Sequence, residues 1–341
     1  MTALIEPNAA SFAAATRVPT IKGWHHMSEL KPGNYVFGPD GRPVKICSVE
    51  PIKEVSMRVF LSDHRCYVCS AYTQLGKACN AYKAHRRLQA IRTRATTPES
   101  LTLGPIKPVR YPKQALPIPS YLIGLLCRED TTHQSDKIII KDVHTKSIDS
   151  LLQKQPSLCK ALQYSKGELA VTSPQLVQTL SGLYHGGPEY ASTYIAPQFL
   201  TACIQERREL LNGILDMTGQ TMTDSVQLRH ICYSMSLSIM ELLASLGIPA
   251  IAIQDRSIRI FSNDLPVSGE TAKAQLERLT LKLRPTVIRK IEPLGYTSNI
   301  RIALESGSKF LLDNYIPVST NTVKSVNDFY SKDCGALWQR G

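Results

Sequence analysis

Two segments of this chain end in side chains that could bind a metal ion. LIGLLCRED ends in Glu129 and Asp130, and LNGILDMTG contains Asp216 and Thr218 near its end. Carboxylates that meet around bridging divalent ions are suited to the hydrolysis of phosphodiester bonds. The two segments therefore predict that these four residues form a candidate catalytic centre.

Both segments also contain a glycine inside an apolar run, Gly124 in the first and Gly213 in the second, and the two are about 89 residues apart. A glycine in a helix costs about 1 kcal/mol relative to alanine. A glycine offsets this cost where two helices pack backbone to backbone, because it has no side chain to separate them. We therefore expect two helices to pack against each other at these glycines. A strand and a helix are predicted for 137–162, and a strand, a helix and a strand for 227–253. This repetition predicts two similar half-domains.

The segment YLIGLLCRED resembles the motif of the LAGLIDADG homing endonucleases, in particular those embedded in inteins. YIAPQFLTACIQERRELLNGILDMTG and SLSIMELLASLGIPA are similar to segments that accompany the second motif in this family. The resemblance implies a monomeric nuclease that binds a long double-stranded DNA target and hydrolyses it with Mg²⁺. Glu129 occupies the motif place of the metal-binding acid, so it is the expected metal ligand.

The second motif departs from the family because Thr218 stands where the acid is expected. A hydroxyl group cannot replace a carboxylate as an anionic metal ligand at neutral pH. Asp216 lies two residues earlier, and residues two apart on a helix do not share a face. Nicking of one strand, or DNA binding without cleavage, therefore stays open as an alternative to double-strand cleavage.

The segments VPTIKGWHHMSELKPGNYVFGPDGRPVKI and IRKIEPLGYTSNIRIALESGSKFLLDNYIPVSTN resemble the start and the end of an intein splicing domain. The resemblance implies that Ser11 is the first nucleophile. It also implies that Asn321 is the cyclising amide and that Thr322 is the second nucleophile. Self-splicing is therefore a second alternative function.

The residues that assist splicing differ from the intein pattern. Thr73 or Tyr72 stands where an activating histidine is expected, and Thr320 replaces the histidine before the terminal asparagine. The late Cys or acid region contains Arg301 and Glu305. Acid–base assistance contributes about 10²–10⁴-fold, so its loss should slow splicing severely. Splicing would also join only ten N-terminal residues to twenty C-terminal ones, a very small product.

The predicted fold class is α+β. It combines a pseudo-symmetric two-repeat LAGLIDADG (αββαββα-type) nuclease domain with a β-rich Hint/intein-like domain into which it is inserted. The predicted parts are a tail at 1–10, the β domain at 11–101 and 281–321, a Pro-rich linker at 102–120, the nuclease domain at 121–280 with repeats at about 121–195 and 196–280, and a tail at 322–341.

The chain is basic, with 40 Lys and Arg against 28 Asp and Glu and a net charge of +12. This excess favours a polyanionic partner, with nucleic acid first and a membrane surface second, and the resemblance to the endonucleases implies DNA and no membrane. Arg86 and Arg87 in KAHRRLQAIRTR, and Arg256 and Arg259 on a predicted sheet edge in IAIQDRSIRIFS, are candidate DNA contacts. A soluble basic protein with solvated charges is the alternative.

Nine cysteines, an odd number, indicate a reduced intracellular protein, cytoplasmic in a prokaryote or phage host and nuclear in a eukaryote. The sequence contains no run of about 18 apolar residues, so it predicts no membrane-spanning helix. A conceivable zinc set is Cys66, Cys69, Cys79 and His85. The surrounding RVFLSDHRCYVCSAY alternates like a pair of strands that turns at 62–64, which favours buried cysteines. Zinc binding stays open.

Overall fold

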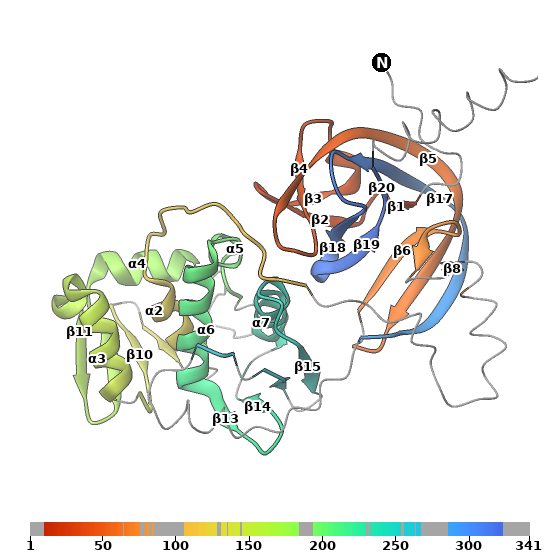
Figure 1. Ribbon diagram of the computed structural model, residues 1–341. Helices are drawn as coiled ribbons and strands as arrows, with labels where there is room; N and C mark the ends of the chain where they lie inside the picture. Colours follow the sequence, from red (N-terminus) through yellow and green to blue (C-terminus); the bar gives the residue numbers. More distant parts are fainter. Residues whose placement is uncertain are drawn as a thin grey trace, which may run out of the picture. The chain divides into compact units, whose positions relative to one another are not determined.

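The computed structural model divides into two compact units (Figure 1). The first unit combines 1–110 with 284–341, and the second covers 111–283, so the first division falls inside the predicted linker. The described residues are 10–63, 65–75, 79–81, 84, 106–127, 131–134, 136–143, 145–183, 194–229, 231, 233–253, 256–262, 264–266 and 286–322. None of the helices in these ranges is long and apolar enough to cross a membrane.

An eight-stranded sheet dominates the first unit, with the order β20-β17-β1-β6-β5-β4-β2-β3. Its strands are β1 (Ser11–Ala13), β2 (Arg17–Thr20), β3 (Gly23–His26), β4 (Tyr35–Phe37), β5 (Pro43–Leu61), β6 (Cys66–Ser70), β17 (Ile288–Leu304) and β20 (Asn321–Thr322). Two strand pairs accompany it, β7 (Gln74–Leu75) with β8 (Cys79–Asn80) and β18 (Lys309–Leu312) with β19 (Ile316–Ser319). Short 3-10 helices are η1 (Met27–Glu29) and η5 (Asp313–Tyr315).

The two long strands β5 and β17 pair antiparallel over 46–61 and 288–304. Their register shifts at three places, one of them between Pro293 and Gly295. A proline cannot donate to the ladder, and Gly295 has a φ of +78°, so the strand bends here without strain. Figure 1 shows both strands curving side by side around the unit.

The core of the first unit joins segments from both ends of the chain. β1 lies between β17 and β6 in the sheet. The ring of Phe12 packs edge-on against that of Phe310, with centroids 5.4 Å apart. Ile302 on β17 and Val59 on β5 belong to the same buried cluster. The first and last parts of the chain therefore fold as one body.

The second unit contains two successions of elements. The first comprises α2 (Ser120–Leu125), β9 (Thr132–His133), β10 (Ile138–Ile140), α3 (Thr145–Lys154), η3 (Pro156–Lys160), β11 (Leu162–Ser165), β12 (Glu168–Val171) and α4 (Pro174–Leu183). The second comprises α5 (Pro197–Leu200), α6 (Ile204–Thr218), β13 (Gly219–Thr221), β14 (Val226–Leu228), α7 (Tyr233–Ser245), β15 (Ala250–Ile253) and β16 (Ser257–Ile260). The strands and helices predicted for 137–162 and 227–253 are confirmed.

The two four-stranded sheets of this unit share one topology. Their orders are β9-β10-β12-β11 and β13-β14-β16-β15, all antiparallel. The elements β9, β10, α3, β11 and β12 begin 87 to 89 residues before β13, β14, α7, β15 and β16. This offset matches the spacing of the two glycine-containing segments. The repeat seen in the sequence therefore extends through both sheets.

One hydrophobic core fills the second unit. It contains Leu122 from α2 and Ile214 from α6, together with Ile138 and Ile258 from the two sheets, all fully buried. Neither sheet has a separate core of its own in the described residues. Because the helices α2 and α6 lie between the halves of this shared core, their contact fixes how the two halves meet.

Candidate functional site

The helices α2 and α6 approach each other at Gly124 and Gly213. A Cβ added to Gly124 would lie 2.3 Å from the carbonyl oxygen of Leu210 and 2.8 Å from the Cα of Gly213. A Cβ added to Gly213 would lie 2.3 Å from the carbonyl oxygen of Tyr121. These contacts are with backbone atoms, which cannot rotate away as a side chain can. The two helices therefore touch backbone to backbone at the glycines.

Thr218 is the last residue of α6, and its side chain is bound to its own helix. Its Oγ1 donates a hydrogen bond to the carbonyl oxygen of Ile214 at 2.8 Å, and the residue is only 7% exposed. Gly219 follows, where a Cβ would lie 2.5 Å from the carbonyl oxygen of Leu215. The second motif thus keeps its closing glycine, whereas its acid is replaced by a buried hydroxyl group.

Asp216 is an acidic side chain of α6 that contacts the helix α2, and Glu206 is another, which accepts a hydrogen bond from Ser120. Asp216 Oδ2 accepts a hydrogen bond from Tyr121 Oη at 2.6 Å and one from Ser147 Oγ at 3.5 Å. Tyr121 belongs to α2, and Ser147 belongs to α3. Asp216 therefore binds across the helix interface, whereas Thr218 binds within α6. Successive residues are about 100° apart on a helix, so the two side chains point in different directions.

The structure leaves the ligand set for Mg²⁺ incomplete. The helix α2 ends at Leu125, and Glu129 and Asp130 lie outside the described residues. No group of three or more His, Cys, Asp or Glu residues that could hold a metal occurs in the described ranges. Asp216 and Thr218 alone supply one carboxylate and one neutral hydroxyl group that is hydrogen-bonded to Ile214, which are fewer oxygen ligands than a divalent ion takes.

The sheet of the second repeat has one apolar and one polar face. Four residues in register across its strands are Gln220, Gln227, Arg259 and Ile251. The next row contains Leu228 and Ile258, which are fully buried and point to the opposite face. Arg229 Nη2 donates to Gln227 Oε1 at 3.2 Å, and Gln227 Nε2 donates to Ser257 Oγ at 3.0 Å. The hydrogen-bonded Gln227, which is 4% exposed, and Arg229 therefore mark the polar face.

The sheet of the first repeat has the same two-faced pattern. One row in register across it contains Thr132, Ile139, Ala170 and Gln163. The row beside it contains Ile138 and Val171, which are fully buried. Each sheet thus packs one face on the shared core and leaves the other, more polar face away from it.

The predicted DNA contacts Arg256 and Arg259 occupy different places in the second sheet. Arg259 lies on the inner strand β16, and its Nε has no hydrogen-bond partner among the described residues. Arg256 is exposed in the turn between β15 and β16, with a φ of +57°. The prediction that one sheet edge carries both arginines was wrong. The edge strand is β15, whereas Arg259 lies on its inner neighbour β16 and Arg256 lies in the turn between them. Arg86 and Arg87 lie outside the described residues.

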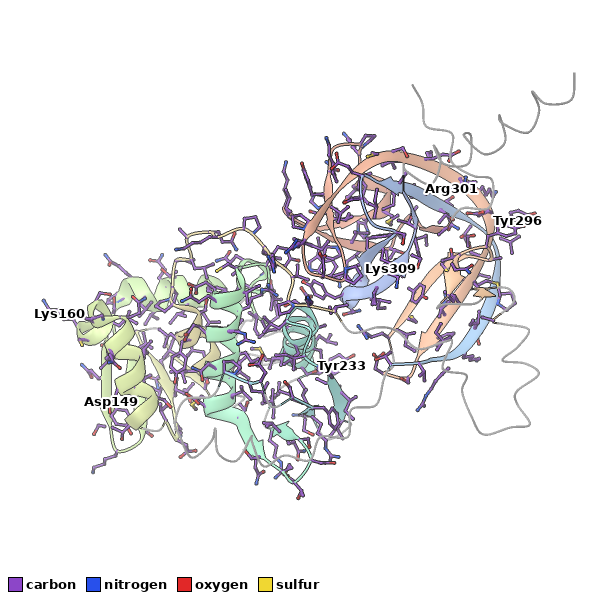
Figure 2. The ribbon with its side chains drawn as sticks, in the orientation of Figure 1. Asp149, Lys160, Tyr233, Tyr296, Arg301 and Lys309 are labelled. Atoms are coloured by element: carbon purple, nitrogen blue, oxygen red, sulfur yellow. The ribbon has the colours of Figure 1, made fainter. Side chains whose placement is uncertain are left out.

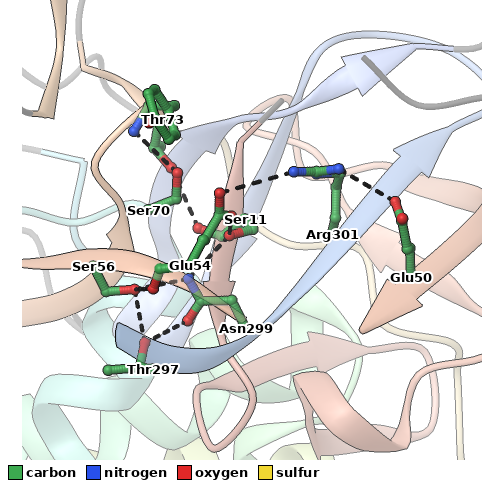
Figure 3. A network of polar contacts seen from close by, with 10 residues as sticks. Ser11, Glu50, Glu54, Ser56, Ser70, Thr73, Thr297, Asn299 and Arg301 are labelled. Carbon is green, nitrogen blue, oxygen red and sulfur yellow. Dashed lines mark hydrogen bonds and ion pairs between the residues drawn. The ribbon is translucent and has the colours of Figure 1, made fainter. Parts of the chain in front are cut away.

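A buried polar network surrounds Ser11 in the first unit (Figure 3). Ser11 Oγ donates a hydrogen bond to Glu54 Oε1, and Asn299 Nδ2 donates to Ser11 Oγ at 3.0 Å. Thr73 Oγ1 donates to the carbonyl oxygen of Ser11 at 3.2 Å. Ser11 is 0% exposed and Glu54 is 7% exposed. A hydroxyl group bonded to a carboxylate in this way is an arrangement that can activate a nucleophile.

Arg301 on β17 completes the charge balance of this network. It pairs in register with Ser11, and its Nη2 lies 3.8 Å from Glu54 Oε2 while its Nη1 lies 3.3 Å from Glu50 Oε2. Arg301 is 3% exposed, whereas Tyr296 on the same strand is 70% exposed (Figure 2). A buried carboxylate needs a charged partner, and the guanidinium group supplies it for Glu54.

The two predicted junction residues Ser11 and Asn321 lie on strands on either side of β17. Ser11 is opposite Arg301, and Asn321 is opposite Ala303. Neighbouring strands are about 4.8 Å apart and residues about 3.3 Å apart along a strand, so the two backbone positions are about 12 Å apart. Thr322 continues the same strand, and the side chains of Asn321 and Thr322 lie outside the described part.

The residues that replace the splicing histidines have different surroundings. Thr73 does reach Ser11, whereas Tyr72 is 46% exposed. Thr320 Oγ1 donates to the carbonyl oxygen of Ile302 at 2.7 Å. Sequence reasoning missed Glu54 and Asn299, for which no motif exists. Their only signal is the two-residue alternation of polar residues in parts of the strands β5 and β17.

The possible zinc ligands Cys66 and Cys69 point to opposite faces of β6. Cys66 is exposed, and Cys69 is buried. Side chains an odd number of residues apart on a strand alternate between its faces, so these two cannot bind one ion. Burial raises the pKa of the Cys69 thiol to about 12, which disfavours the thiolate that zinc binds. The predicted pairing of the strands around 62–64 is confirmed, whereas the Cys79 side chain and His85 lie outside the described residues.

Comparison with known proteins gives distant structural similarities only. No protein-family model matches, and a search of curated proteins finds no significant match. The gp41-1 intein aligns with 91% of this chain and 98% of its own, at 10% identity and a TM-score of 0.27. The MchDnaB-1 intein aligns with 21% of this chain and 59% of its own, at 23% identity and a TM-score of 0.20. A variant of I-DmoI, in complex with its target DNA and in the presence of Mn, aligns with 42% of this chain and 85% of its own, at 12% identity and a TM-score of 0.30. Scores this low establish neither fold nor function for this chain.

Proposed function

We propose that residues 111–283 form a site-specific, double-stranded DNA endonuclease of the LAGLIDADG homing type. The observation that carries the proposal is the backbone contact of Gly124 on α2 with Gly213 on α6. This contact joins two halves whose four-stranded sheets have the same strand order. In this proposal the two halves are pseudo-symmetric and each contributes one sheet to the DNA. The active site lies at the ends of the two helices, near the path of the duplex.

Two features support DNA as the partner. The polar face of the second sheet carries the exposed Gln220 and, in the same row, Arg259, and amide and guanidinium groups are side chains that read base edges in the major groove. The major groove is wide enough to admit β-ribbons. The net charge of +12 favours association with the phosphate backbone. A duplex contacted by two similar sheets would have a long target site.

The loss of the acid at Thr218 limits the proposed reaction. Hydrolysis of each strand needs an activated water and an ion that neutralises the developing charge. Glu129 is the residue proposed to hold Mg²⁺ through its carboxylate, and Thr218 supplies no anionic ligand in the second motif. We therefore propose that this monomeric enzyme nicks one strand much faster than it cuts the second.

Selection and cleavage assays test this proposal in sequence. Duplexes that bind the full chain are selected from a random library, and the selected site is placed in a supercoiled plasmid. With Mg²⁺ we expect nicked circles to accumulate before linear DNA. Glu129→Gln should slow nicking by about 10²-fold or more while binding is retained. Asp149→Asn, which removes an exposed carboxylate on the helix α3 and not on a sheet, is the matched control.

Each outcome of these assays has a distinct meaning. Specific binding with no strand breaks in Mg²⁺ or Mn²⁺ supports the DNA-binding alternative without catalysis. Rapid linearisation contradicts the limiting role of Thr218. Glu129→Gln nicking at the parental rate contradicts the proposed metal ligand. Failure to enrich any sequence contradicts DNA recognition itself.

A second candidate function is protein splicing or its first step by the Hint/intein-like first unit. It is favoured by the positions of Ser11 and Asn321 on the two strands that flank β17, opposite Arg301 and Ala303. The first step would transfer the acyl group of Ala10 from the amide nitrogen of Ser11 to its Oγ. Intact-mass measurement of the full chain over time tests the complete reaction. A chain of 11–321 supports splicing, and an unchanged mass with no ester at Ser11 contradicts this candidate.

A further inference from the structure

The buried pair of Ser11 and Glu54 carries an inference about how the first step would proceed. We propose that Glu54 is the catalytic base that accepts the proton of Ser11 Oγ when this oxygen attacks the carbonyl carbon of Ala10. The inference rests on the second candidate function, and it assigns to a carboxylate the proton transfer that the sequence leaves without a histidine. Glu54 qualifies because it contacts the reacting oxygen directly.

The hydrogen bonds of Ser11 direct its proton toward Glu54. A serine hydroxyl group has one proton to donate. Asn299 Nδ2 donates to Ser11 Oγ at 3.0 Å, so that contact cannot use the serine proton. The amide of Asn299 is oriented in turn by Thr297 Oγ1, which donates to Asn299 Oδ1 at 2.9 Å. The proton of Ser11 is therefore held on the line to Glu54 Oε1.

The surroundings of Glu54 leave one carboxylate oxygen for this task. Arg301 Nη2 lies 3.8 Å from Oε2, on the other side of the carboxylate. Among the described residues, Oε1 receives its side-chain hydrogen bond from Ser11. The pair is screened from solvent, since Ser11 is 0% exposed and Glu54 is 7% exposed. In such a site water does not compete with Ser11 for the base.

The position of Ser11 is fixed on its other side by Thr73. Thr73 Oγ1 donates to the carbonyl oxygen of Ser11 at 3.2 Å, and the strand β1 is paired on both edges, with β6 and β17. The backbone of the nucleophile is thus held while its hydroxyl group points to Glu54. Fixed geometry of the reacting groups is itself a large contribution to rate.

The proposed step conserves atoms and charge. Glu54 takes the proton from Ser11 Oγ, and Oγ forms an ester bond to the carbonyl carbon of Ala10. The bond from that carbon to the Ser11 nitrogen then breaks, and the nitrogen receives the same proton from Glu54. The product is an ester-linked chain with a free amine at Ser11, and Glu54 returns to its starting state.

Hydroxylamine trapping of the full chain tests the inference. Hydroxylamine cleaves the ester and releases 1–10, which leaves a chain of 11–341 that mass spectrometry identifies. Hydroxylamine also cuts Asn-Gly bonds, but a cut between Asn212 and Gly213 gives different masses. Glu54→Gln should lower the rate of ester formation by about 10²-fold or more. Glu54→Asp keeps the charge beside Arg301 but withdraws the carboxylate, so it should also lower the rate.

Matched variants separate this inference from the function on which it rests. Glu50→Gln removes the other carboxylate bound to Arg301 and should leave the rate within about threefold of the parent, because it does not touch Ser11. Ser11→Ala should abolish trapping. If the parent chain forms no trapped ester, the second candidate function fails. If the parent forms the ester and both Glu54 variants match its rate, the catalytic role of Glu54 is wrong. Thermal unfolding followed by tryptophan fluorescence shows whether each variant still folds. If Glu54→Gln has lost its fold, the rate of ester formation in Glu54→Asp decides whether Glu54 is the base.

Discussion

Gly124 and Gly213 face each other so closely that a Cβ on Gly213 would lie 2.9 Å from the Cα of Gly124. The contact is reciprocal, since each glycine also faces a carbonyl oxygen of the other helix. Such proximity cannot be relieved by a change of rotamer. The two halves of the second unit are therefore joined by a contact that tolerates no side chain at either position.

Substitution of either glycine by alanine should destabilise the second unit. Alanine favours a helix by about 1 kcal/mol, but an added methyl group in a packed interface costs about 1–3 kcal/mol or more. Because the obstructing atoms are backbone, we expect a cost in the upper part of this range and a net loss of about 1–2 kcal/mol for Gly124→Ala or Gly213→Ala. Urea unfolding followed by far-UV circular dichroism measures it, since the helices α2 to α7 belong to this unit.

Gln205→Ala is the control for this prediction. Gln205 is exposed on the first turn of α6, so its replacement should change stability by less than about 0.5 kcal/mol. Equal stability of the glycine variants and the parent would show that the helices can separate at no cost.

Thr218→Asp should make the protein depend on a divalent ion. Thr218 is 7% exposed, and a carboxylate at this position would be buried without the hydrogen bond that Thr218 makes to Ile214. We expect a loss of about 1–3 kcal/mol without metal. Mg²⁺ should recover part of this loss if Glu129 lies near, because an ion that binds only the folded state stabilises it.

Thermal unfolding of Thr218→Asp with Mg²⁺ and with EDTA measures this dependence. Thr218→Asn has a similar size but no charge, so its unfolding midpoint should be the same in both solutions. In the plasmid assay, Thr218→Asp should also raise the ratio of linear to nicked DNA. An unfolding midpoint that Mg²⁺ does not change would count against a metal site at this end of α6.

The helix contact could be predicted from the sequence because it depends on a local signal. Gly124 and Gly213 stand in equivalent places of two similar segments, and a glycine inside a helix is costly unless a close contact requires it. The strands and helices that follow were also readable, since their apolar periods are regular. The contacts of the individual residues in the two glycine-containing segments could not be predicted from the sequence. The bond of Asp216 to Tyr121 depends on how α2 and α6 pack, which is a tertiary property.

The network around Ser11 shows where sequence reasoning ends. Glu54 lies in a charged stretch, KEVSMR, which is typical of an exposed strand. It is buried because β5 pairs with β17, where Ser298 faces Lys53 and Thr297 faces Glu54. That register depends on the shift between Pro293 and Gly295, which no local pattern encodes. Its partners Ser11 and Arg301 are 43 and 247 residues away in sequence, so only the fold brings them together.

Arg259→Ala should weaken DNA binding in a manner that depends on salt. Arg259 lies on the inner strand β16 in register with Gln227, and its Nε has no hydrogen-bond partner among the described residues. If its guanidinium group contacts a phosphate, the slope of log K against log salt should fall by about one. If it contacts a base, the slope stays and discrimination between sites falls by about 1–3 kcal/mol.

Fluorescence anisotropy at several salt concentrations, with the selected site and scrambled DNA, distinguishes these two results. Arg58→Ala is the control, because Arg58 is exposed on β5 in the first unit and should leave slope and specificity unchanged. Binding by Arg259→Ala that equals the parent at every salt concentration and on both DNAs would remove this face of the sheet from the interface.

Asp63 should make the stability of the first unit depend on pH in the acid range. Burial raises the pKa of Asp63, but hydrogen bonds and the charge of Arg65 outweigh it and lower the pKa below its ordinary value of 3.8. Asp63 Oδ2 accepts from Arg65 Nη2 at 2.7 Å and from Thr286 Oγ1 at 3.0 Å, which ties the turn after β5 to the residues just before β17. A lowered folded-state pKa contributes stability that is present above pH 3.8 and is lost as pH falls through the lower, folded-state value.

Asp63→Asn removes this contribution. The variant should be less stable than the parent at neutral pH, and the difference should shrink as pH falls below about 4. Tryptophan fluorescence during thermal unfolding follows the first unit through Trp24, whose ring packs against Tyr315. Asp40→Asn, at an exposed carboxylate 3.9 Å from Arg42, should differ little from the parent at every pH. A difference between parent and Asp63→Asn that stays constant from pH 7 to pH 3 would mean that the ion pair with Arg65 does not stabilise the fold.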